Sequence, residues 1–427
     1  MKRKKRKKKS FLTKFKEFIL KTKKDLYDEV DEEITNDSSF SIAEVMVIVC
    51  ISILFGVIIG YIITYSRNPV NQVSSNKNLN EIVSVYNNIL EDYYGDLDQD
   101  KLTDAAINGM IESLDDPYSN YMDTDTTNSF NESVDGEFVG IGVTVMFSDN
   151  TNKIIEILKG SPAEKAGLKV DDVIVKVDGK DVINVSGDEL AKLIRGKVGS
   201  KVQITVKRNQ EEKTFSVKRD KIEIESVEST KFDQNDKSIG YIDVDIFAAN
   251  TFQQFNDALK GLEKKKIDSL IIDVRDNPGG HLTQVKEILS LFFDKKTVLY
   301  QVESKDKKEK IYSLSKGKKS YPVVVLINRD SASASEILAS CFQDNYKKAM
   351  IIGTNSYGKG TVQKSKMLSD GTSVKYTGEK WLTANGKWIN GVGVTPDNTV
   401  EQSTQYYDNP TYENDKQLQV ALDELTK

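Results

Sequence analysis

The 427-residue sequence predicts an α/β fold built on a mostly parallel sheet, with a smaller β-rich domain and helical segments before it. Three observations predict this arrangement. In residues 228–400, short runs of Val, Ile and Leu alternate with helical patterns, which is typical of a parallel sheet covered on both faces. In residues 134–222 the apolar residues follow the period of strands, and in residues 78–130 they follow the period of helices.

The charge distribution separates a basic tail, residues 1–41, from an acidic remainder. Residues 1–24 contain 13 Lys and Arg and one acid, whereas the rest of the chain has 47 basic and 64 acidic residues. Nucleic acid is therefore excluded as the main partner, because phosphate binding needs a cationic surface. Two cysteines and one histidine exclude a disulfide scaffold and a His-rich metal site. We expect neither a metal nor a cofactor.

Residues 42–66 predict a membrane-spanning helix. The run from Val45 to Ile63 has 19 residues without a charge, about 28 Å of helix. A signal peptide would have a shorter apolar region nearer the N-terminus, followed by a small-residue cleavage site. The basic run at Lys2–Lys9 predicts a cytoplasmic N-terminus, a single pass through the cell membrane and an extracytoplasmic main part. Anionic lipid is the expected partner of this run, and nucleic acid is the alternative.

Residues 78–130 predict a helical N-terminal subdomain. Apolar residues recur at intervals of three and four over Leu79–Leu90 and again over Ala105–Leu114. The second pattern is stopped by Asp116 and Pro117. The pair of helices is interpreted as a packing subdomain, and an arm that forms a homodimer is the alternative.

Residues 134–222 resemble a PDZ domain of the kind found in exported proteases. The resemblance depends on four segments: Gly140, Ile141, Gly142 and Val143; Ser161–Ala163; Ala166–Leu168; and Asp172–Ile174. A Gly-x-Gly turn lets backbone N–H groups converge on a carboxylate, and an exposed strand edge pairs with the peptide behind it. The alternative is that the glycines only make a tight turn. The resemblance implies binding of an apolar C-terminal tail, with Arg195 as a surface or inter-domain charge.

Three polar or Gly-rich segments follow strands of the predicted parallel sheet: Asn277–Gly280, Ser331–Glu336 and Tyr357–Gln363. Sites in this fold class form at the carboxyl ends of the strands. Small residues around Ser333 let its hydroxyl project from a turn, and the following helix N-terminus favours negative charge. Gly279 and Gly280 can present backbone N–H groups to an oxyanion.

A nucleophilic serine needs a base. His281 is the only histidine, and it is interpreted as a cap of the next helix more readily than as this base. Lys359, between Gly358 and Gly360, is the alternative, because a buried lysine has a lowered pKa. A phosphate-binding loop is the rival interpretation, but the loop lacks the G-x-x-x-x-G-K-[ST] spacing that such a site requires.

Two further serines and one glutamine complete the predicted site. Gln363 can hold the Lys359 amine by a hydrogen bond. By spacing alone Ser331 and Ser335 also remain candidate nucleophiles. Ser331 is interpreted as a polar residue of the turn and Ser335 as a helix N-cap.

These segments resemble the carboxy-terminal processing peptidases, also called tail-specific proteases. So does the segment Asn390–Asp397. The resemblance implies a ClpP/crotonase-like serine peptidase domain over residues 228–400, with a C-terminal helical extension over residues 401–427. It also implies Ser333 as nucleophile, Lys359 as general base and Gln363 as its orienting residue. The oxyanion donors would be a backbone N–H of the glycine turn, Gly279 or Gly280, and that of Ala334.

The expected function is therefore that of a serine endopeptidase that recognises the C-termini of protein or peptide substrates. A non-catalytic PDZ scaffold that binds peptides is one alternative. An acyl-transfer enzyme acting on a small substrate is another, because the same oxyanion donors would serve it.

Overall fold

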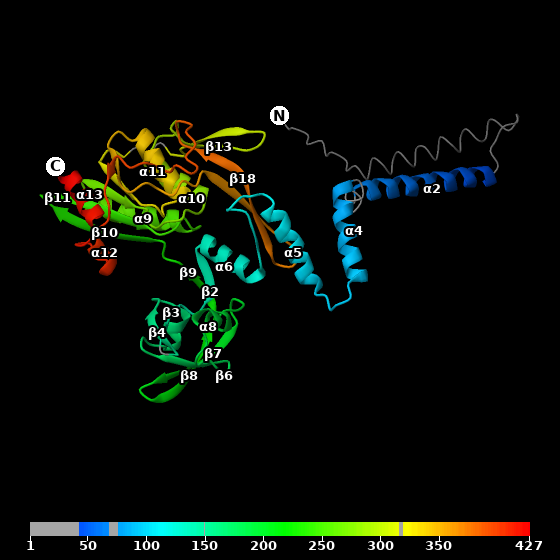
Figure 1. The fold of residues 1–427 in the computed structure, drawn as a ribbon, viewed down its shortest axis with the longest axis horizontal. Coiled ribbons are helices and arrows are strands. Elements are labelled where there is room, and N and C mark those ends of the chain that lie inside the picture. Colours follow the sequence, from blue (N-terminus) through cyan, green and yellow to red (C-terminus); the bar gives the residue numbers. More distant parts are fainter. Residues whose placement is uncertain (1–41, 68–75, 149, 316–318) are drawn as a thin grey trace, which may run out of the picture. The chain divides into compact units, whose positions relative to one another are not determined.

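The computed structural model describes residues 42–67, 76–148, 150–315 and 319–427 (Figure 1). It divides into two compact units, residues 1–102 and 103–427. The prediction for the basic tail, residues 1–41, falls outside the described residues.

The described residues of the first unit include the helices α2 (Ile42–Arg67) and α4 (Lys77–Asp92). Helix α4 begins at Asn76, whose side chain accepts the N–H groups of Asn78 and Leu79. Over the part of the chain that the structure describes, no helix is long and apolar enough to cross a membrane. The membrane-spanning helix is therefore not confirmed.

The sheet that carries the site has six strands in the order β10-β11-β12-β15-β16-β19. Their bounds are Val227–Gln234, Lys237–Val244, Ser269–Asp273, Val323–Ile327, Ala349–Gly353 and Asn398–Thr399. Only β10 is antiparallel to its neighbour, and all the other pairs are parallel. The prediction of a mostly parallel sheet is confirmed. Every residue of β12 and β15 is buried, which explains their unbroken apolar sequences.

Helices cover both faces of this sheet. On one face the core includes side chains from α9 (Thr251–Lys264), α10 (Leu282–Ser290) and α11 (Ala334–Asn345). On the other face α13 (Lys416–Thr426) packs Leu418 and Leu422 against the strands. The short helix α12 (Thr404–Asp408) precedes α13. The C-terminal extension thus supplies the second layer that a parallel sheet needs.

A second sheet, which the sequence did not predict, has the order β1-β18-β13-β14, with β17 also paired to β18. Its strands are Asn120–Met122, Ser373–Leu382, Val298–Glu303, Lys308–Tyr312 and Thr361–Met367. Helices α5 (Gln99–Glu112) and α6 (Thr124–Asp135) flank β1 in sequence. Most residues of β14 and β17 are exposed or half-buried and many are charged, so these strands lack the apolar alternation that sequence analysis uses.

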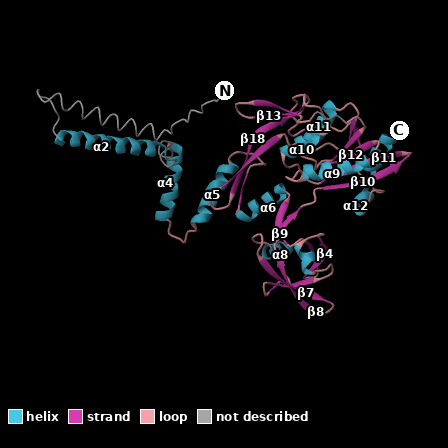
Figure 2. Ribbon diagram, turned by 180° about the vertical axis from the view of Figure 1, so that it is seen from behind, coloured by secondary structure: helices cyan, strands magenta, loops and turns pink. Residues whose placement is uncertain are grey.

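The PDZ-like region forms a sheet in the order β3-β4-β5-β7-β8, with β6 added to β5. These strands are Val143–Ser148, Thr151–Ile157, Val173–Val177, Lys201–Arg208, Glu211–Lys218 and Lys180–Asp181, and the helices are α7 (Pro162–Ala166) and α8 (Gly187–Ile194). The strands and α8 are visible together in Figure 2. Strand β2 (Glu137–Gly140) is not part of this sheet, because it pairs with β9 (Asp220–Glu223).

Candidate active site

Ser333 occupies a strained turn between β15 and α11. Its backbone has φ 53° and ψ −109°, a conformation that non-glycine residues rarely adopt. Strain of this kind costs on the order of 1–3 kcal/mol and persists only where surrounding contacts impose it. Ser333 is the N-cap residue of α11. Sequence analysis assigned a helix N-cap to Ser335, and that assignment is wrong.

The carboxylate of Glu336 joins the Ser333 turn to the Lys359 loop. One oxygen, Oε2, accepts the backbone N–H groups of Ser333 and Lys359, both at 2.8 Å. The other, Oε1, accepts the Ser356 hydroxyl and the Gly358 N–H, both at 2.6 Å. Glu336 is fully buried, and burial raises its pKa although the four donors oppose the rise. Four neutral donors therefore hold the two loops in register around one carboxylate.

The glycine turn lies directly against the nucleophile. A Cβ atom on Gly279 would come within 2.8 Å of Ser333 Cβ and 3.0 Å of the Ala334 nitrogen. The φ angles of 107° at Gly279 and 137° at Gly280 also favour glycine. The Gly279 N–H donates to Asn277 Oδ1 at 2.8 Å. Within the described residues, the N–H groups of Gly280 and Ala334 have no partner, which leaves these two as the candidate oxyanion donors.

Asn277 and the two flanking serines hold the turns together. The Asn277 side chain donates to the carbonyl of Val244 at the end of β11, and the Asn277 backbone carbonyl accepts the Ser335 hydroxyl at 2.9 Å. The Ser331 hydroxyl donates to the Val274 carbonyl at 2.7 Å. Both serines are fully buried. These contacts give Ser331 and Ser335 structural roles and leave Ser333 as the half-buried serine of the run.

Lys359 is half-buried, and its ammonium lies 5.1 Å from the ring centroid of Tyr118. Burial lowers the pKa of Lys359, and the charge of Lys375 lowers it further, against the charges of Glu336 and Asp116. This lowering agrees with the role of base that was predicted for Lys359. Across the described chain, no hydrogen bond joins Ser333 Oγ to Lys359 Nζ, so proton transfer between them requires these two atoms to come closer.

The two glycines beside Lys359 are required by close neighbours. A Cβ on Gly358 would meet the backbone nitrogens of residues 391–393 at 3.0–3.1 Å, and one on Gly360 would meet Trp388 Nε1 at 2.7 Å. The indole of Trp381, fully buried, donates to the Lys359 carbonyl at 2.7 Å. The segment at 390–397, singled out in the sequence, thus packs against the lysine loop and fixes its backbone.

Sequence analysis gave roles to Gln363 and His281. The Gln363 amide N–H₂ donates to Thr361 Oγ1 at 2.9 Å and to Thr377 Oγ1 at 3.1 Å, and within the described residues no hydrogen bond joins Gln363 to Lys359. His281 is the N-cap residue of α10 but makes no side-chain cap bond. The interpretation of His281 as the cap residue of the next helix is therefore confirmed in its position.

Glu336, Asn277 and Tyr118 are site residues to which sequence analysis gave no role. A signal was available for Glu336, because a glutamate three residues after a serine before a helix is typical of a capping box. No comparable pattern points to Tyr118, since the turn after α5 was interpreted only as a helix stop. Tyr118 reaches the site because β1 joins the second sheet beside β18.

Comparison with known proteins decides the family. Residues 238–400 match the family model of peptidase family S41. A probable CtpA-like serine protease of Staphylococcus haemolyticus is 39% identical over 346 residues, which are 80% of this chain and 68% of the relative. The chain belongs to peptidase family S41.

Other relatives of this S41 peptidase agree with that assignment. The carboxy-terminal processing protease CtpA of Bacillus subtilis is 43% identical over 73% of this chain and 66% of its own length. Residues 139–218 match the PDZ domain model, and residues 63–126 match that of the activating protease CtpB N-terminal domain. A solved photosystem II D1 C-terminal processing protease is 27% identical, with a TM-score of 0.46, over 76% of this chain and 87% of that one. The family model and the two curated relatives show that the chain is a serine-type peptidase of the C-terminal processing kind.

The PDZ domain of this S41 peptidase has an open strand edge beside a helix. Strand β3 pairs only with β4 within its sheet, and helix α8 packs near it. The carbonyls of Ile141 and Gly142 accept the N–H groups of Ala163 and Leu158. Within the described residues, the N–H groups of Ile141 and Gly142 have no partner. Gly142 has φ 77°, and a Cβ there would lie 2.5 Å from Ser161 Cβ. Ile141 and Gly142 can therefore present their N–H groups to a carboxylate.

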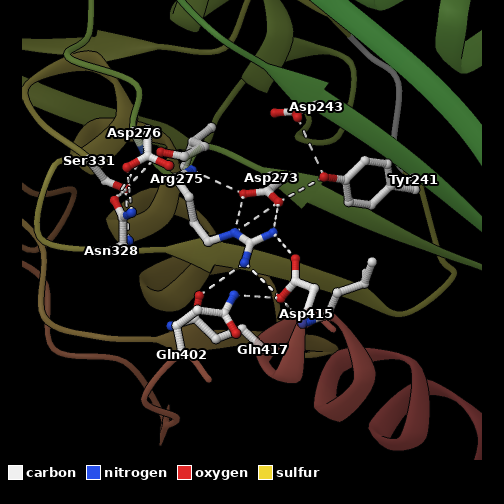
Figure 3. Close-up of polar contacts among 12 residues, drawn as sticks. Tyr241, Asp243, Asp273, Arg275, Asp276, Asn328, Ser331, Gln402, Asp415 and Gln417 are labelled. Atoms are coloured by element: carbon white, nitrogen blue, oxygen red, sulfur yellow. Dashed lines mark hydrogen bonds and ion pairs between the residues drawn. The ribbon is translucent and has the colours of Figure 1, made fainter. Parts of the chain in front are cut away.

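A second buried charged cluster in the peptidase domain surrounds Arg275, which lies between Asp273 and Asp415 (Figure 3). The guanidinium donates to Asp273 Oδ2 at 2.5 Å and to Asp415 Oδ2 at 2.6 Å. Burial opposes the charge of Arg275, but the two carboxylates outweigh it and raise the pKa of Arg275. Since Asp415 is the N-cap of α13, this cluster fastens the C-terminal helix to the end of β12.

Proposed function

We propose that this peptidase cleaves protein substrates near their C-termini with a Ser333–Lys359 dyad. Lys359 Nζ takes the proton of Ser333 Oγ as the oxygen attacks the peptide carbonyl, and the N–H groups of Gly280 and Ala334 hold the oxyanion. Lys359 then gives the proton to the leaving amine, and a water molecule activated by the same lysine releases the acyl group. Gln363 is proposed to orient Lys359 once the lysine leaves its present position.

The observation that carries the proposal is the Glu336 carboxylate, which binds the backbone of both dyad residues at 2.8 Å. A hydrogen-bonded link of this kind fixes the distance between two loops that are 26 residues apart in sequence. Because its four donors are neutral N–H and O–H groups, Glu336 is held, in the described part of the chain, without a direct ion pair to the Lys359 ammonium. Lysine with a lowered pKa next to a strained serine turn suits acyl transfer at neutral pH.

The PDZ domain is proposed to recruit the substrate tail. A C-terminal carboxylate would accept the N–H groups of Ile141 and Gly142, with the tail added as a strand to the edge of β3 beside Val143. Gly140, buried at the end of β2, closes this turn. Affinity would come from the main-chain bonds and selectivity from an apolar last side chain.

The test is cleavage of a labelled, unfolded casein bearing either an apolar or a charged C-terminal tail by the detergent-purified full-length chain. Ser333→Ala and Lys359→Ala are expected to lower kcat/KM by at least about 10³-fold, while His281→Ala stays within about threefold. Cleavage that survives Lys359→Ala would refute the dyad. Tail binding without cleavage in any preparation would favour the peptide-binding scaffold.

We further propose that residues 42–66 anchor the chain in the cell membrane with the N-terminus in the cytoplasm and the catalytic part outside. Support comes from the uncharged run at 45–63, from the basic tail before it and from exposed apolar side chains of α2 such as Phe55 and Val57. In fractionated cells, the chain should stay with membranes after carbonate washing. Added protease should digest the catalytic part in intact spheroplasts.

We also propose that α4 contributes to a homodimer. None of its residues is buried, and Ile82, Val83 and Val85 are exposed on it. Sedimentation equilibrium of the full-length chain in detergent should give twice the monomer mass. Val85→Glu should shift it to the monomer, whereas Glu81→Gln on the same helix should not.

A further inference from the structure

Tyr118 lies against the proposed base, with 5.1 Å between the Lys359 ammonium and the centre of the phenol ring. We propose that Tyr118 is a positioning residue that holds the charged form of Lys359 over its ring until the lysine turns toward Ser333. This inference rests on the proposed Ser–Lys function. It adds a residue of the turn that follows α5 to the groups that act on the base. It assigns to the N-terminal part of residues 103–427 a direct role in setting the state of the base.

The position of Tyr118 is fixed by three hydrogen bonds to Asp116. The carboxylate accepts the Tyr118 N–H at 3.2 Å, the Ser119 hydroxyl at 2.5 Å and the Thr377 hydroxyl at 2.6 Å. Thr377 belongs to β18 and also accepts the Gln363 amide. The turn at Asp116 is therefore hydrogen-bonded to β18. Gln363, which was predicted to orient Lys359, contacts Thr377 of this strand instead.

The ring distinguishes the two protonation states of Lys359. An aromatic face attracts a cation and has little attraction for a neutral amine. Burial and then the neighbouring Tyr357 raise the pKa of Tyr118 to about 12, so the ring stays an uncharged phenol near neutral pH. Tyr118 thus favours the ammonium, as do the charges of Glu336 and Asp116.

Two other influences on Lys359 act in the opposite direction, since its burial and the charge of Lys375 both favour the neutral amine. The balance among these groups decides how much base is present at a given pH. To become the base, Lys359 releases one proton to water, leaves the ring, and then accepts the proton of Ser333 Oγ.

The experiment is the pH dependence of kcat/KM for casein cleavage by the full-length chain in detergent, with Tyr118→Phe and Tyr118→Leu. The acidic limb reports the pKa of the free enzyme's base. Leucine keeps an apolar cover but removes the aromatic face, so the limb should move to lower pH by about 0.5–1 unit. Phenylalanine keeps the ring and should leave the limb in place.

Matched controls separate this inference from the dyad itself. If Tyr118→Leu shows no cooperative thermal transition and is therefore not folded, Tyr118→Met replaces it. Methionine is a second apolar, non-aromatic side chain, and the same shift of the acidic limb is expected. An acidic limb that is identical in the leucine, methionine and phenylalanine variants overturns the role of Tyr118 while leaving the dyad intact. Cleavage by Lys359→Ala would instead overturn the dyad and, with it, this inference.

Discussion

Glu336 and Arg275 are both buried charges of the peptidase domain, and the protein balances them in different ways. Glu336 is surrounded by four neutral N–H and O–H donors. Arg275 is paired with two carboxylates, Asp273 and Asp415. The first arrangement stabilises a charge with dipoles, and the second with opposite charges.

The difference matters for catalysis. A carboxylate paired directly with Lys359 would hold the lysine in its charged form and raise its pKa by more than a unit. Because Glu336 uses only its backbone and hydroxyl donors, Lys359 can have a lowered pKa beside a buried anion. Arg275 has no proton to exchange near neutral pH, so its region can use ion pairs for structure without any such cost.

The largest expected effect on stability comes from removing the charge of Arg275, which is paired with Asp273 and Asp415. Arg275→Met leaves Asp273 and Asp415 buried without their cation, which should lower the free energy of unfolding by about 3–5 kcal/mol. Urea unfolding of the full-length chain would measure the loss. Arg329→Met is the control, because the Arg329 side chain is 87% exposed, and it should change stability by no more than about 0.5 kcal/mol. Equal losses in both variants would contradict the comparison.

Replacement of Glu336 should lower the stability less than replacement of Arg275, but it should also cause a large loss of activity. Glu336→Gln places an amide N–H₂ against N–H or O–H donors, which should cost about 1–3 kcal/mol in the free energy of unfolding. Displacement of the Ser333 and Lys359 backbones should lower kcat/KM by about 10²-fold. Casein cleavage and urea unfolding would measure the two effects. Glu263→Gln, which loses a half-exposed pair with Lys319, should leave cleavage within about twofold.

A third expected effect is a gain of stability that depends on pH. Burial first, and then the charges of Asp273, Asp245 and Glu228, against that of Arg275, raise the pKa of Asp243 from 3.8 to about 7. In the unfolded chain this carboxyl ionises near pH 4, whereas in the folded chain it holds its proton until about pH 7. Folding is therefore progressively disfavoured as pH rises between these values, and the penalty is constant above them.

Asp243→Asn should remove that penalty. The variant should match the parent chain near pH 4 and become more stable toward pH 7, by up to on the order of 1 kcal/mol per pH unit. Urea unfolding at pH 4.5, 6 and 7.5 would measure the trend. Asp236→Asn, in the exposed turn between β10 and β11, should show no such trend. A gain that is the same at all three pH values would contradict the pKa argument.

The sequence by itself determined the parallel sheet, the PDZ domain and the three turns that form the site. Short continuous apolar runs such as Val323–Ile327, separated by helical patterns, are typical of strands covered on both faces, and glycines 279, 280, 358 and 360 marked the places where backbones approach closely. These are local signals, since each depends on residues within one short segment. The predicted roles of Ser333 and Lys359 came from the same segments and from their resemblance to a family.

The tertiary structure alone decided which groups face the base and how the buried charges are balanced. Tyr118 and Lys359 are separated by 241 residues, and they meet because β1 pairs with β18 in a sheet of largely polar strands. Gln363 turns to Thr377 for the same reason, through the pairing of β17 with β18. No local pattern specifies such contacts, because they depend on strand order and register, which are fixed only when the whole sheet forms.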